Sequence, residues 1–391
     1  MTTQTLQAPL PGTDWKDAKR HLWLLGAVLP LLPLVGWQLA QITGYGVFWW
    51  FAPIFFYTVI PLLDWLVGED PSNPPESAVA RLEADRYYRW LVYAYIPVQY
   101  AMLVWGAWAF TSLDLRWWEL LGLAISIGGI GGVGINTAHE LGHKKESLER
   151  WLAKITLAQV AYGHFFVEHN KGHHKNVATP EDPASSRLGE NFYAFLPRTV
   201  IGSLKSAWRI EKARLARAGK SPWSWENENL QAWGMTVVLW GALLAVFGPA
   251  LLPFLIIQAV YGFSLLEVVN YVEHYGLLRQ KEAAGRYERC QPRHSWNSNH
   301  IVTNLLLYQL QRHSDHHANP TRAYQALRHF DESPQLPTGY AGMVLLAYFP
   351  PLWRRVMDKR VLAHYRGDLS RANIQPSRRT ELLARYGQTT A

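Results

Sequence analysis

Apolar residues in this chain are gathered into long runs, and strongly charged stretches separate the runs. A bilayer hydrocarbon core of about 30 Å requires about 20 helical residues per crossing, and six runs meet that length. The pattern therefore predicts an all-α, polytopic integral membrane protein whose short, uncharged turns near residues 44–46 and 248–249 form tight hairpins. The predicted spans are 22–42, 47–67, 89–111, 118–138, 230–247 and 248–270.

Lysine and arginine are divided unequally between the two sides that these spans define. Of the 38 basic residues, only Arg116 lies in a connection on one side, and all others lie on the opposite side. Basic loops remain on the cytoplasmic side of a membrane. We therefore predict that both termini are cytoplasmic, and that residues 140–229 and 271–391 form a cytoplasmic helical cap. The cap and the spans are predicted to make one membrane-embedded catalytic unit, 1–391.

Overall composition hides this organisation, because 49% apolar residues and a mean hydropathy of −0.10 are ordinary for a soluble protein. The 19 tryptophans are unusual, and many flank the apolar runs, where amphipathic rings favour the membrane interface. A single cysteine, Cys290, excludes an intramolecular disulfide, a CxxC rubredoxin site and an iron–sulfur cluster. One cysteine also fits a reducing compartment.

Twelve of the fifteen histidines lie between residues 139 and 317. Residues four apart on a helix share one face, so three such pairs are each predicted to chelate one ion. Adjacent histidines diverge by about 100° around a helix, which suits two ions lying side by side. The four clusters are His139-Glu-Leu-Gly-His143, Glu168-His169-Asn-Lys-Gly-His173-His174, Glu273-His274 and His313-Ser-Asp-His316-His317. The four-residue pairs are His139/His143, His169/His173 and His313/His317.

All four clusters are predicted to lie at one membrane face. The fourth and sixth spans both run toward the cytoplasm, one ending at His139 and the other just before His274. A helix extended through His143 would carry its ligands about 9 Å beyond a core of about 30 Å. The remaining clusters belong to the cytoplasmic segments. Many converging imidazoles favour a late first-row metal over magnesium or calcium, and two ions below a lipid-facing pocket suit oxygen activation by iron.

Carboxylates next to the histidines are predicted to accept the outer ring N–H of an imidazole and so fix its orientation, or else to bridge the metals. Two rival functions account for the motifs less well. HELGH alone is typical of a zinc protease, but one zinc would leave at least six histidines unexplained. A transporter with incidental histidines would place polar groups at the bilayer midplane, whereas the histidine clusters of this chain are predicted to lie at one membrane face. The adjacent carboxylates are Glu140, Glu168, Glu273 and Asp315.

Three further features are each compatible with two roles. The basic amphipathic stretch 204–220 either lies on anionic headgroups, which we favour, or docks an acidic electron donor. The glycine run at 128–134 either allows close helix packing, the safer choice, or leaves room for an acyl-like chain. The aromatic residues of 49–56 either line a substrate tunnel or contact lipid.

The motifs HELGH, EHNKGHH, NYVEHYG (Asn270–Gly276) and LQRHSDHH (Leu310–His317) together resemble the membrane-bound alkane 1-monooxygenase family. That family belongs to the fatty acid desaturase-like group of histidine-rich di-iron membrane enzymes. The motif NYVEHYG distinguishes the alkane 1-monooxygenases from the desaturases of this group, because desaturases lack it. The resemblance covers nearly the whole chain.

This resemblance implies oxygen-dependent conversion of medium- and long-chain n-alkanes to 1-alkanols in the bacterial inner membrane, with two iron ions and O₂ as co-substrate. Electrons would come from rubredoxin and its reductase, and no nucleic acid would be bound. Because this chain lacks rubredoxin cysteines, the donor would be another polypeptide. The nearest alternative is a fatty acyl desaturase or hydroxylase, which would need a polar or basic site for its head group. The implied iron ligands are His139, His143, His169, His173, His174, His274, His313, His316 and His317.

Overall fold

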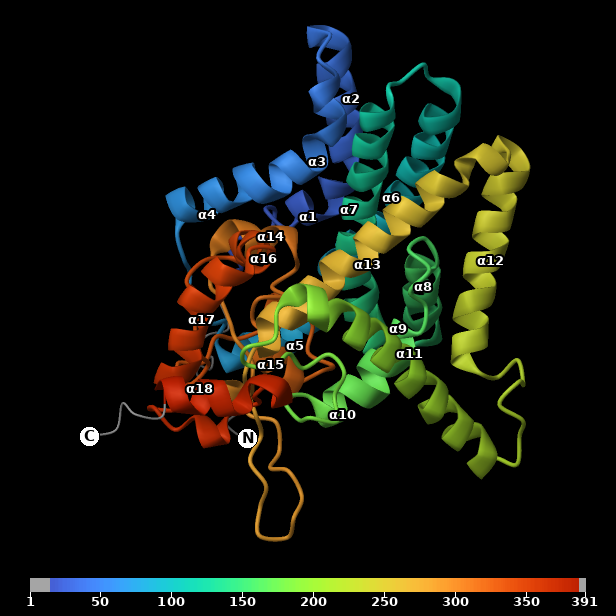
Figure 1. Ribbon diagram of the computed structural model, residues 1–391. Helices are drawn as coiled ribbons and strands as arrows, with labels where there is room; N and C mark the ends of the chain where they lie inside the picture. The colour runs from blue at the N-terminus through green and yellow to red at the C-terminus, as the bar shows by residue number, and fades with distance from the viewer. Residues whose placement is uncertain (1–14, 387–391) are drawn as a thin grey trace, which may run out of the picture.

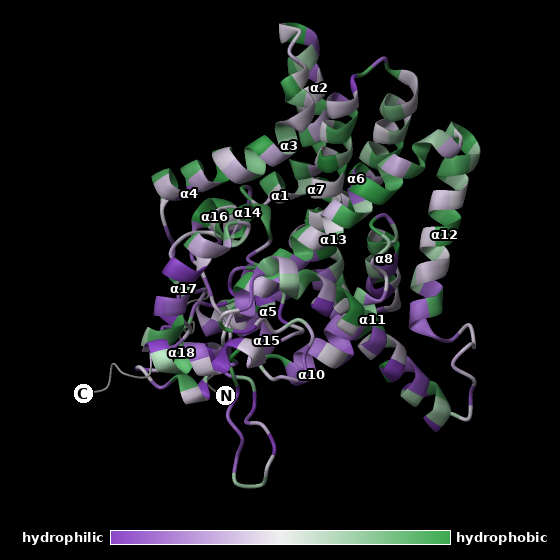
Figure 2. Ribbon diagram, viewed as in Figure 1, coloured by the Kyte–Doolittle hydropathy of each residue, from purple (hydrophilic) through white to green (hydrophobic). Residues whose placement is uncertain are grey.

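A computed structural model describes residues 15–386, which are helical with no β-strand among them. Figure 1 shows long helices rising from a lower part built of one long helix, several shorter helices and loops. Figure 2 shows that the rising helices are largely apolar, whereas polar residues dominate the lower part. The all-α prediction is confirmed.

Five helical stretches among the described residues are long and apolar enough to cross a membrane. They agree with five of the six predicted spans to within a few residues at most ends. The predicted span 89–111 lies inside α6 (Arg86–Ser112), a continuous helix of 27 residues. Its tyrosines, its tryptophans and the buried Gln99 make α6 less apolar than the other five. The five stretches are Leu24–Thr43, Gly46–Val67, Trp117–Gly142, Glu228–Phe247 and Pro249–His274.

Short helical segments make up the first two of these stretches. The first comprises α1 (Leu24–Val28), a 3₁₀ turn and α2 (Leu32–Thr43), with prolines that cannot donate to the helical ladder at the two junctions. The second continues through α3 (Phe51–Ile54) and a π-helical segment to α4 (Ile60–Val67). Gly44 ends α2 with a left-handed φ of 74°, which confirms the predicted tight hairpin.

Helix α7 (Trp117–Gly142) is the most buried of the long apolar helices and packs against α6, α13 (Leu252–His274) and α8 (Ser147–Ala158). Two glycines of its glycine run, Gly128 and Gly132, face the backbone of α13. A Cβ at Gly128 would lie 2.5 Å from the carbonyl oxygen of Gln258, and one at Gly132 would lie 2.7 Å from that of Gly262. Gly128 and Gly132 therefore serve close helix packing, and Gly132 also lines the apolar cavity described below.

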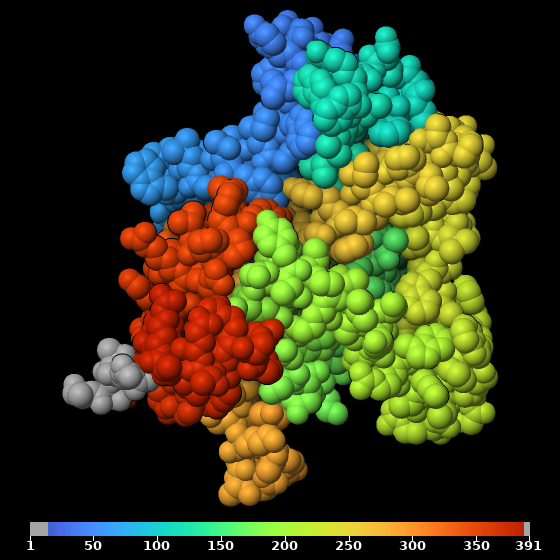
Figure 3. Space-filling view, in the orientation of Figure 1, coloured from blue at the N-terminus to red at the C-terminus, as the bar shows by residue number. Residues whose placement is uncertain are grey.

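The lower part combines two segments that are distant in sequence. One runs through α9 (Phe165–Val167), α10 (His174–Asn176) and α11 (Phe192–Arg217). The other is the C-terminal segment, which packs beside it in the space-filling view (Figure 3). The helices of that segment are α14 (Ile301–Leu306), α15 (His313–Ala318), α16 (Tyr340–Ala347), α17 (Pro350–His364) and α18 (Arg379–Tyr386).

Packing of α7 against α13 generates the first prediction. Gly128→Ala should destabilise the protein by about 1–3 kcal/mol, because the new methyl group meets the α13 backbone rather than a flexible side chain. Gly241→Ala on α12 (Glu228–Phe247) is the matched control, since a Cβ there meets nothing within 4 Å. Thermal unfolding of both variants in detergent measures the difference. Equal midpoints would contradict the packing role.

Candidate metal centre

Four chain segments bring nine histidines together below the apolar helices. Helix α7 carries His139 near its end and is capped by His143, and His274 is the last residue of α13. The π-helical segment η4 (Glu168–His173) and α10 supply three more, and α15 supplies the last three. Residues at the ends of two long apolar helices thus meet residues of η4, α10 and α15, and the predicted convergence of the four clusters is confirmed.

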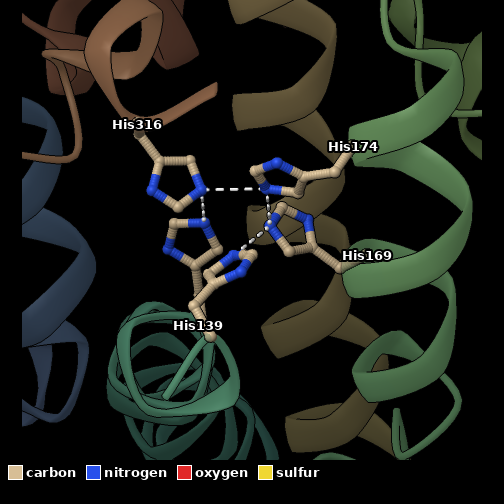
Figure 4. Close-up of side chains that lie close together, drawn as sticks. His139, His169, His174 and His316 are labelled. Atoms are coloured by element: carbon tan, nitrogen blue, oxygen red, sulfur yellow. Dashed lines mark hydrogen bonds between the residues drawn. The ribbon is translucent and has the colours of Figure 1, made fainter. Parts of the chain in front are cut away.

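The first group contains five imidazoles whose ligand atoms all lie within 4.8 Å of one another. The Nε2 atom of His316 is 2.8 Å from that of His139 and 3.0 Å from that of His174. The Nε2 atom of His169 is 3.0 Å from that of His174 and 3.1 Å from that of His143. Figure 4 shows the labelled rings of this group turned toward one another. The five are His139, His143, His169, His174 and His316.

The second group contains four buried imidazoles: His173, His274, His313 and His317. The Nε2 atom of His313 is 2.9 Å from that of His317 and 3.3 Å from that of His274. The Nε2 atom of His173 is buried and has no hydrogen-bond partner. A buried ring nitrogen without a partner is costly unless it binds something, and here it lies within the group.

Both groups fit a bound metal ion. Two ring nitrogens each about 2.1 Å from one ion, at right angles, lie about 3.0 Å apart, which matches the observed Nε2 separations. A neutral imidazole has only one N–H, so hydrogen bonds alone cannot satisfy a nitrogen such as Nε2 of His174 that meets two others. Burial lowers the pKa of six of the histidines well below its usual value, so they are neutral and able to ligate. The six are His143, His169, His174, His313, His316 and His317.

The division of the nine histidines into two groups tests the pairs of histidines that were predicted to share one ion. His139 and His143 lie in the first group, and His313 and His317 lie in the second, as predicted. The members of each adjacent pair, at 173–174 and 316–317, fall into different groups, which is also confirmed.

The predicted pair His169/His173 is wrong, because its members lie in different groups. Residues 168–173 form a π-helix, in which hydrogen bonds run from residue i to i+5 and each turn is wider than an α-helical turn. The wider turn displaces residue 173 from the position that it would hold beside His169 in an α-helix, and His169 lies against His174 instead.

Two outer contacts orient the ligands, and neither was predicted from the sequence. His173 Nδ1 lies 2.9 Å from a carboxylate oxygen of Asp182, which also accepts from Ser185. Burial would lower the pKa of His173, but the Asp182 carboxylate raises it above its ordinary value. His274 Nδ1 lies 3.4 Å from the carbonyl oxygen of His294. Neither partner adjoins its histidine in sequence, so no local pattern marks it.

Three of the four carboxylates predicted from the sequence do not contact the nine histidines. Glu140 pairs with Lys144 at 2.8 Å, and Asp315 accepts from Arg322, also at 2.8 Å. Glu168 lies over Gly172, and its oxygens make no hydrogen bond to an imidazole. Only Glu273 contacts one of the nine histidines, with an oxygen 3.2 Å from His313 Nε2. That nitrogen faces the second group, so Glu273 approaches the centre from the ligand side rather than from outside.

An apolar cavity runs from the long helices to both groups of histidines. Its lining includes His139 and His169 of the first group, His313 of the second group, and Glu273. Among the aromatic residues of 49–56, only Phe56 lines it, whereas Trp50 donates to the carbonyl oxygen of Trp118. Its apolar lining includes Leu29, Ile60, Val133, Leu265, Leu306 and Val344.

Comparison with known proteins gives a consistent result. Residues 115–347 match the fatty acid desaturase family. An alkane 1-monooxygenase of Alcanivorax borkumensis is 52% identical over 98% of this chain and 95% of its own length. One of Pseudomonas putida is 52% identical over 95% of this chain and 93% of its own. A xylene/toluene monooxygenase hydroxylase component of Pseudomonas putida is 29% identical over 62% of this chain and 64% of its own.

Outer contacts of the histidines generate the second prediction. Asp182→Asn should weaken metal retention about 10- to 100-fold, because His173 loses the carboxylate that fixes its orientation. Glu140→Gln makes the same chemical change at a carboxylate that pairs with Lys144, so it should retain metal. Metal content of the purified variants after graded chelator treatment measures the effect. A larger loss in Glu140→Gln than in Asp182→Asn would contradict the assignment.

Proposed function

The chain belongs to the fatty acid desaturase family and, within it, to the alkane 1-monooxygenases, and on that basis we propose that it hydroxylates the terminal carbon of medium- and long-chain n-alkanes with O₂. One observation carries this proposal: an apolar cavity among the long helices ends at two groups of converging imidazoles. The product is the 1-alkanol.

The proposed cofactor is a pair of iron ions, one in each group of histidines. Nitrogen-only donor sets favour a late first-row metal, and the oxygenase chemistry of the relatives favours iron among those metals. When bound, iron activates O₂, so that one oxygen atom enters the substrate and the other leaves as water with two electrons and two protons. The proposed ligands are His139, His143, His169, His174 and His316 for one ion, and His173, His274, His313 and His317 for the other.

Cavity chemistry favours a hydrocarbon over an acyl substrate. No lysine or arginine is among the residues that line the cavity in the described part of the chain. A fatty acyl substrate carries a polar head group that would need such a partner, which weighs against the desaturase alternative. An alkane binds by desolvation alone, at about 0.8 kcal/mol per buried methylene. Selection of the chain end then depends on the shape of the cavity beside His139 and His313.

We propose that the whole chain forms one unit in the bacterial inner membrane, with six spans. Helix α6 is the third, because it packs along α7 and joins it through a short connection (Figure 1). The asymmetry of basic residues supports cytoplasmic termini and a cytoplasmic metal centre. The substrate then arrives from the lipid phase, directly into helices that are already immersed in it.

The proposed electron donor is rubredoxin, which receives its electrons from rubredoxin reductase. A separate donor is needed because the single cysteine cannot form an iron–sulfur site in this chain. A basic pocket beside the end of α17 suits an acidic donor, and its lining includes Arg293, His294, Arg366 and Arg371. The carbonyl oxygen of His294 meets His274 Nδ1, which links this pocket to a proposed iron ligand. No nucleic-acid partner is proposed.

Metal analysis combined with turnover tests the function. Purified protein should contain two iron ions per chain and convert an n-alkane to its 1-alkanol with reduced rubredoxin in air. The same reaction without oxygen should give no product. A fatty acyl substrate should be turned over poorly. One zinc ion per chain, or alkanol formation without oxygen, would contradict the proposal.

Donor docking generates a third, separate test. The double variant Arg366→Glu and Arg371→Glu should raise the KM for rubredoxin about tenfold at low salt, because both exposed charges line the basic pocket. Its kcat at saturating donor should be unchanged, and added salt should shrink the difference. Arg217→Glu on α11 is the control at the other candidate surface. A larger KM effect in that control would move the docking site to α11.

A further inference from the structure

A second basic pocket lies between α8, η4, α11 and the beginning of α12. Four cationic side chains line it: Arg150, Lys154, Lys171 and Arg214. They come from segments that are distant in sequence, so the cluster is a product of the fold rather than of one basic run. Neither the metal centre nor the apolar cavity uses any of them.

Carboxylates neutralise only part of this charge. Glu228 lies 2.6 Å from Arg150, 2.6 Å from Lys171 and 3.3 Å from Lys154. Glu211 lies 2.7 Å from Arg214 and 3.2 Å from Lys171. Two carboxylates therefore share four cations.

The neighbouring ion pair between Lys220 and Glu226 adds no net charge, although Glu226 also lines the pocket. The pocket consequently retains an excess of two positive charges.

Several N–H donors remain available to a ligand. The side chains of Arg150 and Lys171 are 38% and 32% exposed, and each can donate more hydrogen bonds than its carboxylate contacts use. Lys154 is only 4% exposed and lies beside the ring of Trp151. A buried ammonium group that shares its carboxylate with two other cations is under-compensated. An anion at the mouth of the pocket would supply the missing charge.

The pocket opens at the edge of an apolar span. Glu228, which holds three of the cations, is the first residue of α12. The loop before it carries Trp223 and Trp225, which are 73% and 67% exposed. Exposed tryptophans beside a span favour the headgroup layer of a bilayer. In Figure 1 this end of α12 lies at the lower right, on the same side of the apolar helices as the metal centre.

We propose that this pocket binds the phosphate of an anionic membrane phospholipid. Basic pockets beside spans at a membrane face suit such head groups. A lipid is favoured over an acidic protein because the flanking tryptophans set the pocket at headgroup depth, where the bilayer itself occupies the approach. Lys171 belongs to η4, between His169 and His173, so a bound head group would stabilise the segment that carries these two of the nine histidines.

Lipid binding to the purified full-length protein tests the proposal. Phosphatidylglycerol and phosphatidylcholine are titrated into detergent-solubilised protein, and bound lipid is counted by native mass spectrometry. Arg150→Gln should weaken phosphatidylglycerol binding about fivefold, whereas Arg150→Lys should restore most of it. Arg217→Gln, an exposed arginine of α11 outside the pocket, should bind like the unaltered protein. Phosphatidylcholine should bind weakly to all four proteins.

Three outcomes would overturn the proposal. Equal phosphatidylglycerol binding by Arg150→Gln and the unaltered protein would remove the pocket from the binding site. Complete displacement of the lipid by millimolar inorganic phosphate would assign the pocket to a free anion. A raised KM for rubredoxin in Arg150→Gln, with lipid binding unchanged, would assign it to the donor. Because none of these measurements uses alkane turnover, failure here leaves the proposed hydroxylase activity standing.

Discussion

Close contact between α7 and α13 is the constraint on which the rest of the structure depends. Backbone meets backbone at Gly128 and Gly132, so the two helices cannot shift relative to each other without a clash or a gap. That contact fixes His139 and His274 at a common depth, although they are far apart in the sequence. Interiors pack at nearly crystalline density, so this register passes directly to the ligand positions. The segments η4, α10 and α15 then bring their own histidines to the two groups that His139 and His274 have already positioned.

Much of this arrangement follows from the sequence, because helical periodicity and bilayer thickness are local rules. Together they predict that His139 and His274 share a membrane face, and that the adjacent pairs at 173–174 and 316–317 divide between two groups. The same rules fail at His169, where a π-helix replaces the expected α-helix. In this wider turn the partner of His169 is His174 rather than His173. A π turn differs from an α turn in its i to i+5 hydrogen bonds, which the α-helical spacing rule does not anticipate.

Contacts between distant segments lie beyond local rules. Asp182 reaches His173 through an irregular loop, and His294 meets His274 through a backbone carbonyl that any residue could supply. Glu140 and Asp315 adjoin histidines in sequence but turn toward Lys144 and Arg322. Neighbours on a helix point about 100° apart, so a residue next to a ligand does not share that ligand's direction. Sequence adjacency to a ligand is therefore a poor predictor of contact with it.

The apolar cavity and the two basic pockets lie in different places around the metal centre. The apolar cavity opens among the long helices and has no cationic lining among the described residues, which suits a hydrocarbon. The two basic pockets lie elsewhere, one beside the start of α12 and one beside the end of α17. Separation of this kind has a physical basis, because a cation in the cavity would have to be desolvated for every substrate bound. Placing the positive charge outside the apolar route lets the same protein admit alkanes while its basic pockets stay available to the anionic partners proposed for them.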